Sequence, residues 1–195
     1  LPSHGITTGP VSIDLAKMMA RKDRVVDELT KGIGMLMKKN KVKVLRGSGK
    51  LAGPKRVLVS KDGGVEEEIE AENTLLATGS VPIELPFLPF DGKHVVTSTE
   101  ALAFDRVPGH LVVVGAGAVG LELGSVWNRL GAQVTVIELL PTLVPFADRQ
   151  VAKALEKSLA RQGLNFRLKG KVAGAQIDGD TITVTVRNEK DESES

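Results

Sequence analysis

Leu111-Val112-Val113-Val114-Gly115-Ala116-Gly117-Ala118-Val119-Gly120 is the stretch that decides the fold of this chain. Its four apolar residues predict a buried parallel strand, and they lead directly into the pattern G-x-G-x-x-G. An amphipathic segment follows up to Leu130, and Gly131 ends it. A second apolar strand is predicted over 133–138. This order of strand, turn, helix and strand is typical of a unit that binds a dinucleotide.

The three glycines of this pattern have different expected roles. Gly115 permits a tight turn after the strand, Gly117 lets a pyrophosphate approach the backbone, and Gly120 lets the helix pack closely on the strand. The pyrophosphate would lie on the free N–H groups of the helix N-terminus, where the helix dipole is positive. A glycine-rich turn in some other strand–helix unit is the alternative. The flanking strands and the helix favour dinucleotide binding.

Glu138 indicates which dinucleotide would bind. A carboxylate at the end of the second strand can accept hydrogen bonds from both hydroxyl groups of the adenine ribose, and it would repel a 2′-phosphate. No Lys or Arg occurs between Glu138 and Arg149 to pair with such a phosphate. NAD is therefore favoured over NADP. The alternative interpretation of Glu138 is an exposed carboxylate at a strand end.

The composition excludes several classes of protein. The chain has 195 residues, 42% hydrophobic and 3% aromatic, so an aliphatic core of the α/β class is expected. Its 26 basic and 24 acidic residues give a net charge of +2, too small to indicate a nucleic-acid surface. No apolar run is long enough to span a bilayer, and no signal peptide is visible. Cysteine is absent, which excludes thiol and zinc-thiolate chemistry in this chain.

The first half of the sequence predicts a long helix followed by short strands. Apolar residues at spacings of three and four predict the helix over about 13–39. Residues 74–80 have the pattern of a buried strand that ends in a turn of small residues, and a proline-rich connection over 81–89 marks the best domain boundary. Between them an antiparallel meander is predicted, with strands at 42–45, 56–60 and 65–69.

The second half predicts further elements around the dinucleotide unit. Asp148 is expected to cap a second helix that Gly163 ends, and Phe166 and Leu168 are expected on a third parallel strand. The remaining elements are a short strand at 94–97, a short helix at about 99–104, and a hairpin of 172–177 and 181–186 around Asp178-Gly179-Asp180. Leu1 is not a start methionine, so the N-terminal end is expected to be internal sequence. The charged, serine-rich segment 188–195 is expected to be either a natural disordered terminus or a loop whose second half is missing.

Histidines and glutamates show no metal-binding spacing. His4, His94 and His110 are far apart in the sequence, and we interpret them as structural or surface residues. The glutamate-rich run over 66–72 is interpreted as a solvated face. No metal site is predicted.

Three stretches resemble dihydrolipoamide dehydrogenases, and more broadly the flavin-dependent disulfide reductases. They are 40–49, 74–80 and 114–132, and the continuation Glu122-Leu123-Gly124-Ser125-Val126-Trp127 is fairly specific to that family. The resemblance covers nearly the whole chain. It implies an α/β fold in which 89–195 form a Rossmann-type NAD-binding domain. This domain would consist of a parallel sheet and an antiparallel meander, and it would be truncated before its last strand. It also implies that 1–88 is the later part of an FAD-binding domain.

The resemblance further implies two sets of cofactor-binding residues. Glu122 matches a glutamate near the nicotinamide and the flavin, and Val172 matches a residue that packs on the adenine side. The set for NAD is Gly115, Ala116, Gly117, Ala118, Val119, Gly120, Leu121, Glu122, Glu138 and Val172. The set for FAD is Gly49, Thr78, Gly79 and Ser80.

The chemistry that the resemblance implies belongs to a longer enzyme. Such an enzyme oxidises dihydrolipoamide with NAD+ through a redox disulfide and FAD, and its partners are the lipoyl domains of 2-oxo-acid dehydrogenase complexes or of the glycine cleavage system. It forms a homodimer in the cytoplasm, or in the mitochondrial matrix of eukaryotes, without nucleic-acid or membrane partners. The cysteine pair, the acid–base His–Glu pair and the first FAD-binding glycine motif have no match here. No catalytic residue is therefore assigned, and these residues alone are expected to be inactive.

Two alternatives to this hypothesis stay open. The first is another flavin-dependent NAD(P)H reductase or oxidase of the same fold. The second is a non-catalytic NAD-binding module.

Overall fold

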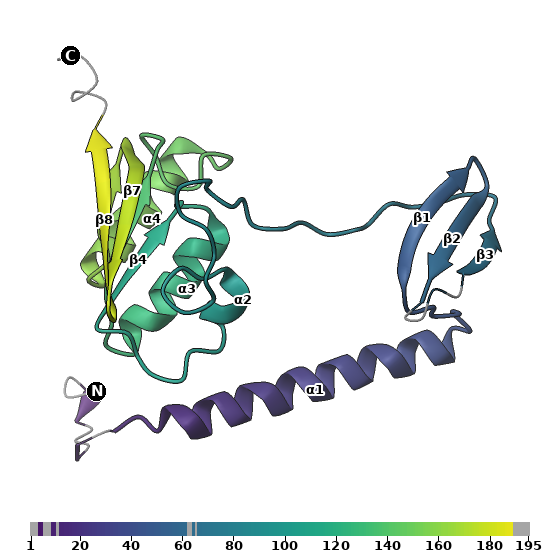
Figure 1. Cartoon of the computed structure of the whole chain (residues 1–195). Coiled ribbons are helices and arrows are strands. Elements are labelled where there is room, and N and C mark those ends of the chain that lie inside the picture. The colour runs from purple at the N-terminus through teal and green to yellow at the C-terminus, as the bar shows by residue number, and fades with distance from the viewer. Residues whose placement is uncertain (1–3, 6–8, 11, 62–63, 65, 189–195) are drawn as a thin grey trace, which may run out of the picture. The chain divides into compact units, whose positions relative to one another are not determined.

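The computed structural model describes residues 4–5, 9–10, 12–61, 64 and 66–188 (Figure 1). The chain divides into two compact units, one formed by Ala20–Val81 and the other by Leu1–Met19 together with Pro82–Ser195. The division at Val81 and Pro82 falls within the proline-rich connection. Among the helices in the described ranges, none is long and apolar enough to cross a membrane.

The larger unit is built on a three-stranded parallel sheet. Strands β4 (His110–Val114), β5 (Gln133–Glu138) and β6 (Asn165–Leu168) lie in the order β4-β5-β6. Helix α3 (Ala118–Arg129) connects β4 to β5, and helix α4 (Arg149–Arg161) connects β5 to β6. The fold around the glycine motif is therefore two successive β–α–β units, which confirms the predicted α/β class.

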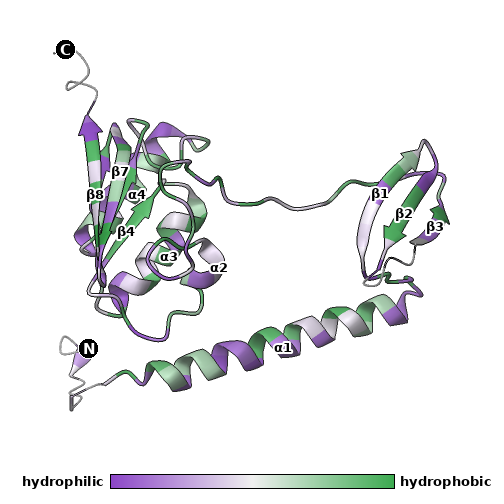
Figure 2. Cartoon of the chain, in the orientation of Figure 1, coloured by the Kyte–Doolittle hydropathy of each residue, from purple (hydrophilic) through white to green (hydrophobic). Residues whose placement is uncertain are grey.

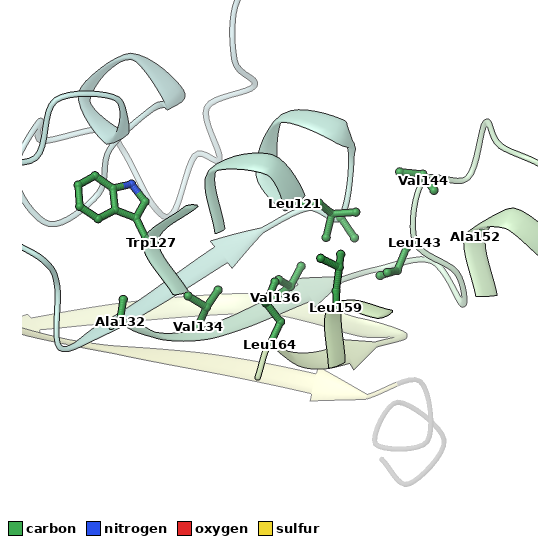
Figure 3. Packing of buried hydrophobic residues seen from close by; sticks show 11 residues of the cluster. Leu121, Trp127, Ala132, Val134, Val136, Leu143, Val144, Ala152, Leu159 and Leu164 are labelled. Carbon is green, nitrogen blue, oxygen red and sulfur yellow. The ribbon is translucent and has the colours of Figure 1, made fainter. Parts of the chain in front are cut away.

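One apolar core joins the sheet to its helices. Val134 and Val136 of β5 are fully buried, and Leu121 of α3 and Leu159 of α4 belong to the same cluster (Figure 3). The core is aliphatic, as the composition predicts, except for Trp127 of α3, which is 1% exposed. The central strand of a parallel sheet is covered on both faces, and this explains why the adjacent residues Val136 and Ile137, which point to opposite faces, are both buried.

Two predicted features beyond the parallel sheet are confirmed. Asp148 caps α4, because its side chain accepts hydrogen bonds from the N–H groups of Gln150 (2.8 Å) and Val151 (3.4 Å). Strands β7 (Gly170–Asp178) and β8 (Thr181–Asn188) form the antiparallel hairpin. Helix α2 (Ser98–Ala101) is shorter than predicted and begins at a capping box formed by Thr97 and Glu100.

The smaller unit contains most of the long helix and the antiparallel meander. Helix α1 (Leu15–Lys39) has the predicted extent but buries none of its residues, and Figure 2 shows its hydrophobic residues interspersed with hydrophilic ones. The meander consists of β1 (Ser48–Gly53), β2 (Arg56–Ser60) and β3 (Glu66–Glu70). Glu67 of β3 pairs with two lysines, Lys61 at 2.7 Å and Lys43 at 2.9 Å, and these contacts lower its pKa to about 2.

The predicted strand at 42–45 is wrong. The turn after Gly53 brings Gly53 opposite Arg56, and pairing then proceeds back to Ser48 opposite Ser60. Because β2 ends at Ser60, residues 42–45 lie beyond the reach of its hydrogen bonds. The tight turn, rather than the apolar pattern, decides which residues pair.

The predicted buried strand at 74–80 is also wrong. The segment has no regular secondary structure, and Leu75 is 89% exposed. A β-strand needs a neighbouring strand to accept and donate its backbone hydrogen bonds. The described chain supplies no such neighbour for this segment, so its apolar pattern does not produce a strand.

The predicted strand at 94–97 is replaced by a loop that Asp91 organises. Oδ1 of Asp91 accepts hydrogen bonds from the N–H groups of Lys93 (2.8 Å), His94 (2.7 Å) and Val95 (2.8 Å). Its Oδ2 lies 3.2 Å from Nδ1 of His94. A side chain that satisfies three successive N–H groups bends the backbone and prevents strand pairing.

Replacing Asp91 with alanine is expected to destabilise the larger unit by about 1–2 kcal/mol at pH 7, because three N–H groups lose their acceptor. The backbone N–H of Lys93, followed by that of Val95, holds the pKa of Asp91 well below its usual value of 3.8. A lowered folded-state pKa stabilises the fold above the unfolded pKa, and this contribution is lost as the pH falls through the folded pKa. Urea unfolding at pH 7 and at pH 3 measures this difference.

The matched variant is Asp91→Asn, whose amide oxygen can accept the same hydrogen bonds without a charge. It should cost less stability than Asp91→Ala at pH 7. A difference between the wild type and Asp91→Ala that stays constant as the pH falls below 3.8 would contradict this account.

Candidate dinucleotide-binding site

The glycine turn joins β4 to α3 and is tied to the neighbouring strand. Gly115 has a φ of +101°, a conformation that favours glycine, and its N–H donates to the carbonyl oxygen of Ile137 at 2.8 Å. Gly117 is the N-cap residue of α3, and no side chain caps the helix there. The N–H groups of the first helical turn are thus left for a ligand, which suits an anion.

Gly117 and Gly120 have different surroundings. A Cβ atom added at Gly117 would meet nothing within 4 Å. At Gly120 it would lie 2.6 Å from the carbonyl oxygen of Gly115 and 3.0 Å from Cγ1 of Val113. Gly120 is therefore required by the close packing of α3 on β4, as the motif predicts. The space beside Gly117 is open to a bound group.

Glu138 ends β5 and lies beside the turn. Its Oε2 accepts a hydrogen bond from the N–H of Ala116 at 2.7 Å, and its Oε1 accepts one from the N–H of Leu140 at 2.8 Å. The carboxylate and the turn are thus in direct contact. A dinucleotide with its pyrophosphate at the turn would have its adenine ribose within reach of this carboxylate.

The other residues of the predicted NAD set fall into two groups. Ala118, Val119 and Glu122 are exposed at the start of α3, where a ligand could reach them. Leu121 and Val172 are buried, and Leu121 belongs to the core. Val172 lies on β7, which contacts β5. The side chain of Leu121 is therefore not accessible to a ligand.

Two residues near the turn were missed by the sequence analysis. Val144 donates its N–H to the carbonyl oxygen of Ala116 at 3.0 Å, and Lys169 donates its N–H to that of Leu140 at 3.3 Å. Both have left-handed backbones, with φ of 38° for Val144 and 56° for Lys169. Neither valine nor lysine favours this conformation, so no local sequence signal indicates it.

The four residues predicted for FAD belong to the smaller unit, which is not the unit that carries this site. Gly49 lies on β1, and Thr78, Gly79 and Ser80 lie in the connection without regular structure. All four are exposed, whereas a flavin pocket would bury them. The FAD set therefore stays a prediction.

Two of the three histidine side chains have structural partners, and His4 is exposed. Nε2 of His110 lies 3.0 Å from Oγ1 of Thr135, and His94 lies beside Asp91. Within the described ranges, no group of three or more His, Cys, Asp or Glu residues could hold a metal ion.

The sequence of the chain matches a known protein family and several known relatives. A family model described as pyridine nucleotide-disulphide oxidoreductase matches residues 1–194. The chain is 46% identical to leghemoglobin reductase of Vigna unguiculata, 44% to mitochondrial dihydrolipoyl dehydrogenase of Pisum sativum, and 46% to dihydrolipoyl dehydrogenase 3 of Pseudomonas putida. These alignments cover 94%, 94% and 93% of this chain, but only 35%, 37% and 39% of the relatives.

Two solved structures of other proteins also match most of this chain. LpdA of Mycobacterium tuberculosis matches with a TM-score of 0.80 and 29% identity, over 91% of this chain and 40% of that chain. RclA of Escherichia coli, an HOCl-induced flavoprotein disulfide reductase, matches with a TM-score of 0.72 and 25% identity, over 88% of this chain and 39% of that chain. The chain thus spans about two fifths of the length of these two proteins.

Proposed function

The chain belongs to the pyridine nucleotide-disulphide oxidoreductase family, and on this premise we propose that it supplies the NAD-binding part of a dihydrolipoyl dehydrogenase. The observation that carries the proposal is the contact between Glu138 and the glycine turn, where the carboxylate lies 2.7 Å from the N–H of Ala116. Pyrophosphate and ribose are adjacent in NAD, and here their two binding groups are adjacent in the fold.

The residues of the site would bind and orient NAD. The first-turn N–H groups of α3 would hold the pyrophosphate beside Gly117, and Glu138 would accept hydrogen bonds from the two ribose hydroxyl groups. Val172 would pack on the adenine side, and Glu122 would lie toward the nicotinamide. When bound, NAD+ supplies the chemistry of a hydride acceptor.

The wider activity is proposed for a longer protein. In it, dihydrolipoamide on the lipoyl domains of a 2-oxo-acid dehydrogenase complex or of the glycine cleavage system would be the reductant, in the cytoplasm or the mitochondrial matrix. Electrons from dihydrolipoamide would pass through a redox disulfide and FAD to NAD+. No step through FAD is assigned to the residues described here, because those predicted to hold it are exposed. We therefore expect the 195 residues alone to form no NADH from dihydrolipoamide.

The test of the nucleotide site is a titration with NADH and NADPH. Trp127 is the single tryptophan of the chain, and energy transfer from it to bound NADH would quench its fluorescence and report binding. NADH should bind more tightly than NADPH, because Glu138 repels a 2′-phosphate. No binding of either nucleotide would refute the proposed site.

Changing Glu138 to Ala and Leu139 to Arg should weaken NADH binding by about 10- to 100-fold and narrow the difference between NADH and NADPH. Hydrogen bonds to a charged group contribute about 1.5–3 kcal/mol, which corresponds to this range. Glu28→Arg, at an exposed position on α1, changes the net charge by the same two units and is the matched control. Unchanged NADH affinity in the double variant would mean that Glu138 does not face the ribose.

In the longer protein, a flavin absorption band would exclude a non-catalytic NAD-binding module. NADH formation from dihydrolipoamide would then support a dihydrolipoyl dehydrogenase. Turnover of glutathione disulfide or peroxide in its place would indicate another reductase of the same fold.

A further inference from the structure

The peptide of Ala116 is held from both sides by the segment that follows β5. Its N–H donates to Oε2 of Glu138 at 2.7 Å, and its carbonyl oxygen accepts from the N–H of Val144 at 3.0 Å. Ala116 is 0% exposed. Oε1 of Glu138 is held in turn by the N–H of Leu140 at 2.8 Å, so the carboxylate has a fixed orientation.

Val144 holds this position in an unfavourable backbone conformation. Its φ of 38° is disfavoured for a β-branched residue, and Pro145 after it further restricts the backbone toward extended conformations. Burial stabilises the arrangement, because Val144 is 6% exposed and the preceding Leu143 is 0% exposed, both within the core cluster of Figure 3. A strained residue that its surroundings maintain beside a binding turn points to a role in that turn.

We propose that Glu138 and Val144 are positioning residues that clamp the Ala116 peptide and orient the pyrophosphate-binding turn before a dinucleotide arrives. Glu138 then acts on the pyrophosphate through the turn, in addition to any contact with the ribose. This inference rests on the proposed function of the site. Its physical reason is that binding groups held in their bound geometry lose less conformational entropy when the ligand binds.

Two nucleotides separate the two roles of Glu138, namely ADP and 2′,3′-dideoxy-ADP. The second has the diphosphate but neither ribose hydroxyl group. If Glu138 contacts only the ribose, Glu138→Ala should leave the affinity for dideoxy-ADP unchanged, or raise it because a negative charge is removed. If Glu138 positions the turn, that affinity should fall by about tenfold, because the buried N–H of Ala116 loses its acceptor.

Two further variants complete the binding experiment. Glu138→Gln should restore part of the dideoxy-ADP affinity, because its amide oxygen can accept from Ala116. Gly117→Ala should weaken the binding of both nucleotides by the same factor, because the new methyl group obstructs only the diphosphate. Dideoxy-ADP affinity in Glu138→Ala equal to or above that of the wild type would overturn the clamp. Failure of the wild type to bind ADP would instead refute the proposed function.

Amide hydrogen exchange tests the clamp without a ligand. In Glu138→Ala the amide of Ala116 should exchange at least about tenfold faster, whereas the amide of Gly115, which donates to the backbone oxygen of Ile137, should stay protected. Val144→Ala keeps the donor and the strained backbone but removes most of the buried side chain, so the amide of residue 144 should exchange faster. An unchanged rate at residue 144 would remove Val144 from the clamp, and an unchanged rate at Ala116 would remove Glu138.

Discussion

Replacing Trp127 with alanine is expected to destabilise the larger unit by about 3–5 kcal/mol, the range for deletion of a large buried aromatic side chain. Trp127 is 1% exposed, and its ring lies 5.0 Å from that of Phe104. Its Nε1–H donates to the carbonyl oxygen of Ala101 at 2.9 Å, which fastens α2 to α3. Truncation would both leave a cavity and remove the hydrogen bond that fastens α2 to α3. Urea unfolding followed by circular dichroism measures the loss, since the variant has no tryptophan.

The controls separate the contributions of Trp127. Trp127→Phe keeps an aromatic ring but removes the hydrogen bond to Ala101, so it should cost less than Trp127→Ala. Val126→Ala changes an exposed neighbour on the same helix and should cost under about 1 kcal/mol. A loss in Trp127→Ala no greater than that in Val126→Ala would show that the ring does not hold α2 to α3.

The parts of the fold that the sequence predicts are those where local pattern and tertiary packing agree. Around Gly115 an apolar strand, a glycine turn and an amphipathic helix all favour the same β–α–β unit, and the structure contains it. Asp148 at the start of α4 and the Asp-Gly turn of the β7–β8 hairpin are equally local signals. Each was predictable because its cause lies within a few residues of its effect.

The errors have non-local causes. Residues 74–80 have a strand pattern, but the described chain offers no strand to pair with them. Residues 42–45 alternate as a strand would, but the turn after Gly53 places the pairing elsewhere. Asp91 replaces a predicted strand by a loop through side-chain hydrogen bonds that apolar periodicity does not reveal. The conformation of these three segments is decided by which strands are available for pairing and by side chains that accept backbone hydrogen bonds.

In the candidate site, too, the residues with local causes are predicted from the sequence and those with non-local causes are not. The motif predicts Gly117, Gly120 and Glu138, since each has a defined place in the β–α–β unit. It does not predict Val144, whose N–H donates to Ala116 from a left-handed backbone and whose side chain is buried. A strained conformation is imposed by the whole fold, so a sequence pattern does not reveal it.

Gly117→Ala is expected to weaken NADH binding by about 100-fold or more while leaving the stability of the free protein nearly unchanged. The new methyl group would meet no protein atom within 4 Å, and the φ of Gly117, −74°, is one that alanine adopts readily. It would, however, occupy the space where the pyrophosphate is proposed to approach the first turn of α3. Loss of one or two hydrogen bonds to a charged ligand, each about 1.5–3 kcal/mol, gives an effect of this size. Fluorescence titration and urea unfolding measure the two quantities on the same sample.

Gly120→Ala is the contrasting variant, because its methyl group would lie 2.6 Å from the backbone oxygen of Gly115. The backbone cannot yield as a flexible side chain would, so α3 must move away from β4 at a cost of about 1–3 kcal/mol. Affinity should then fall together with stability, whereas Gly117→Ala lowers affinity alone. Tight NADH binding by Gly117→Ala would place the pyrophosphate elsewhere and refute the site. A stability loss in Gly117→Ala equal to that in Gly120→Ala would show that the space beside Gly117 is already filled in the free protein.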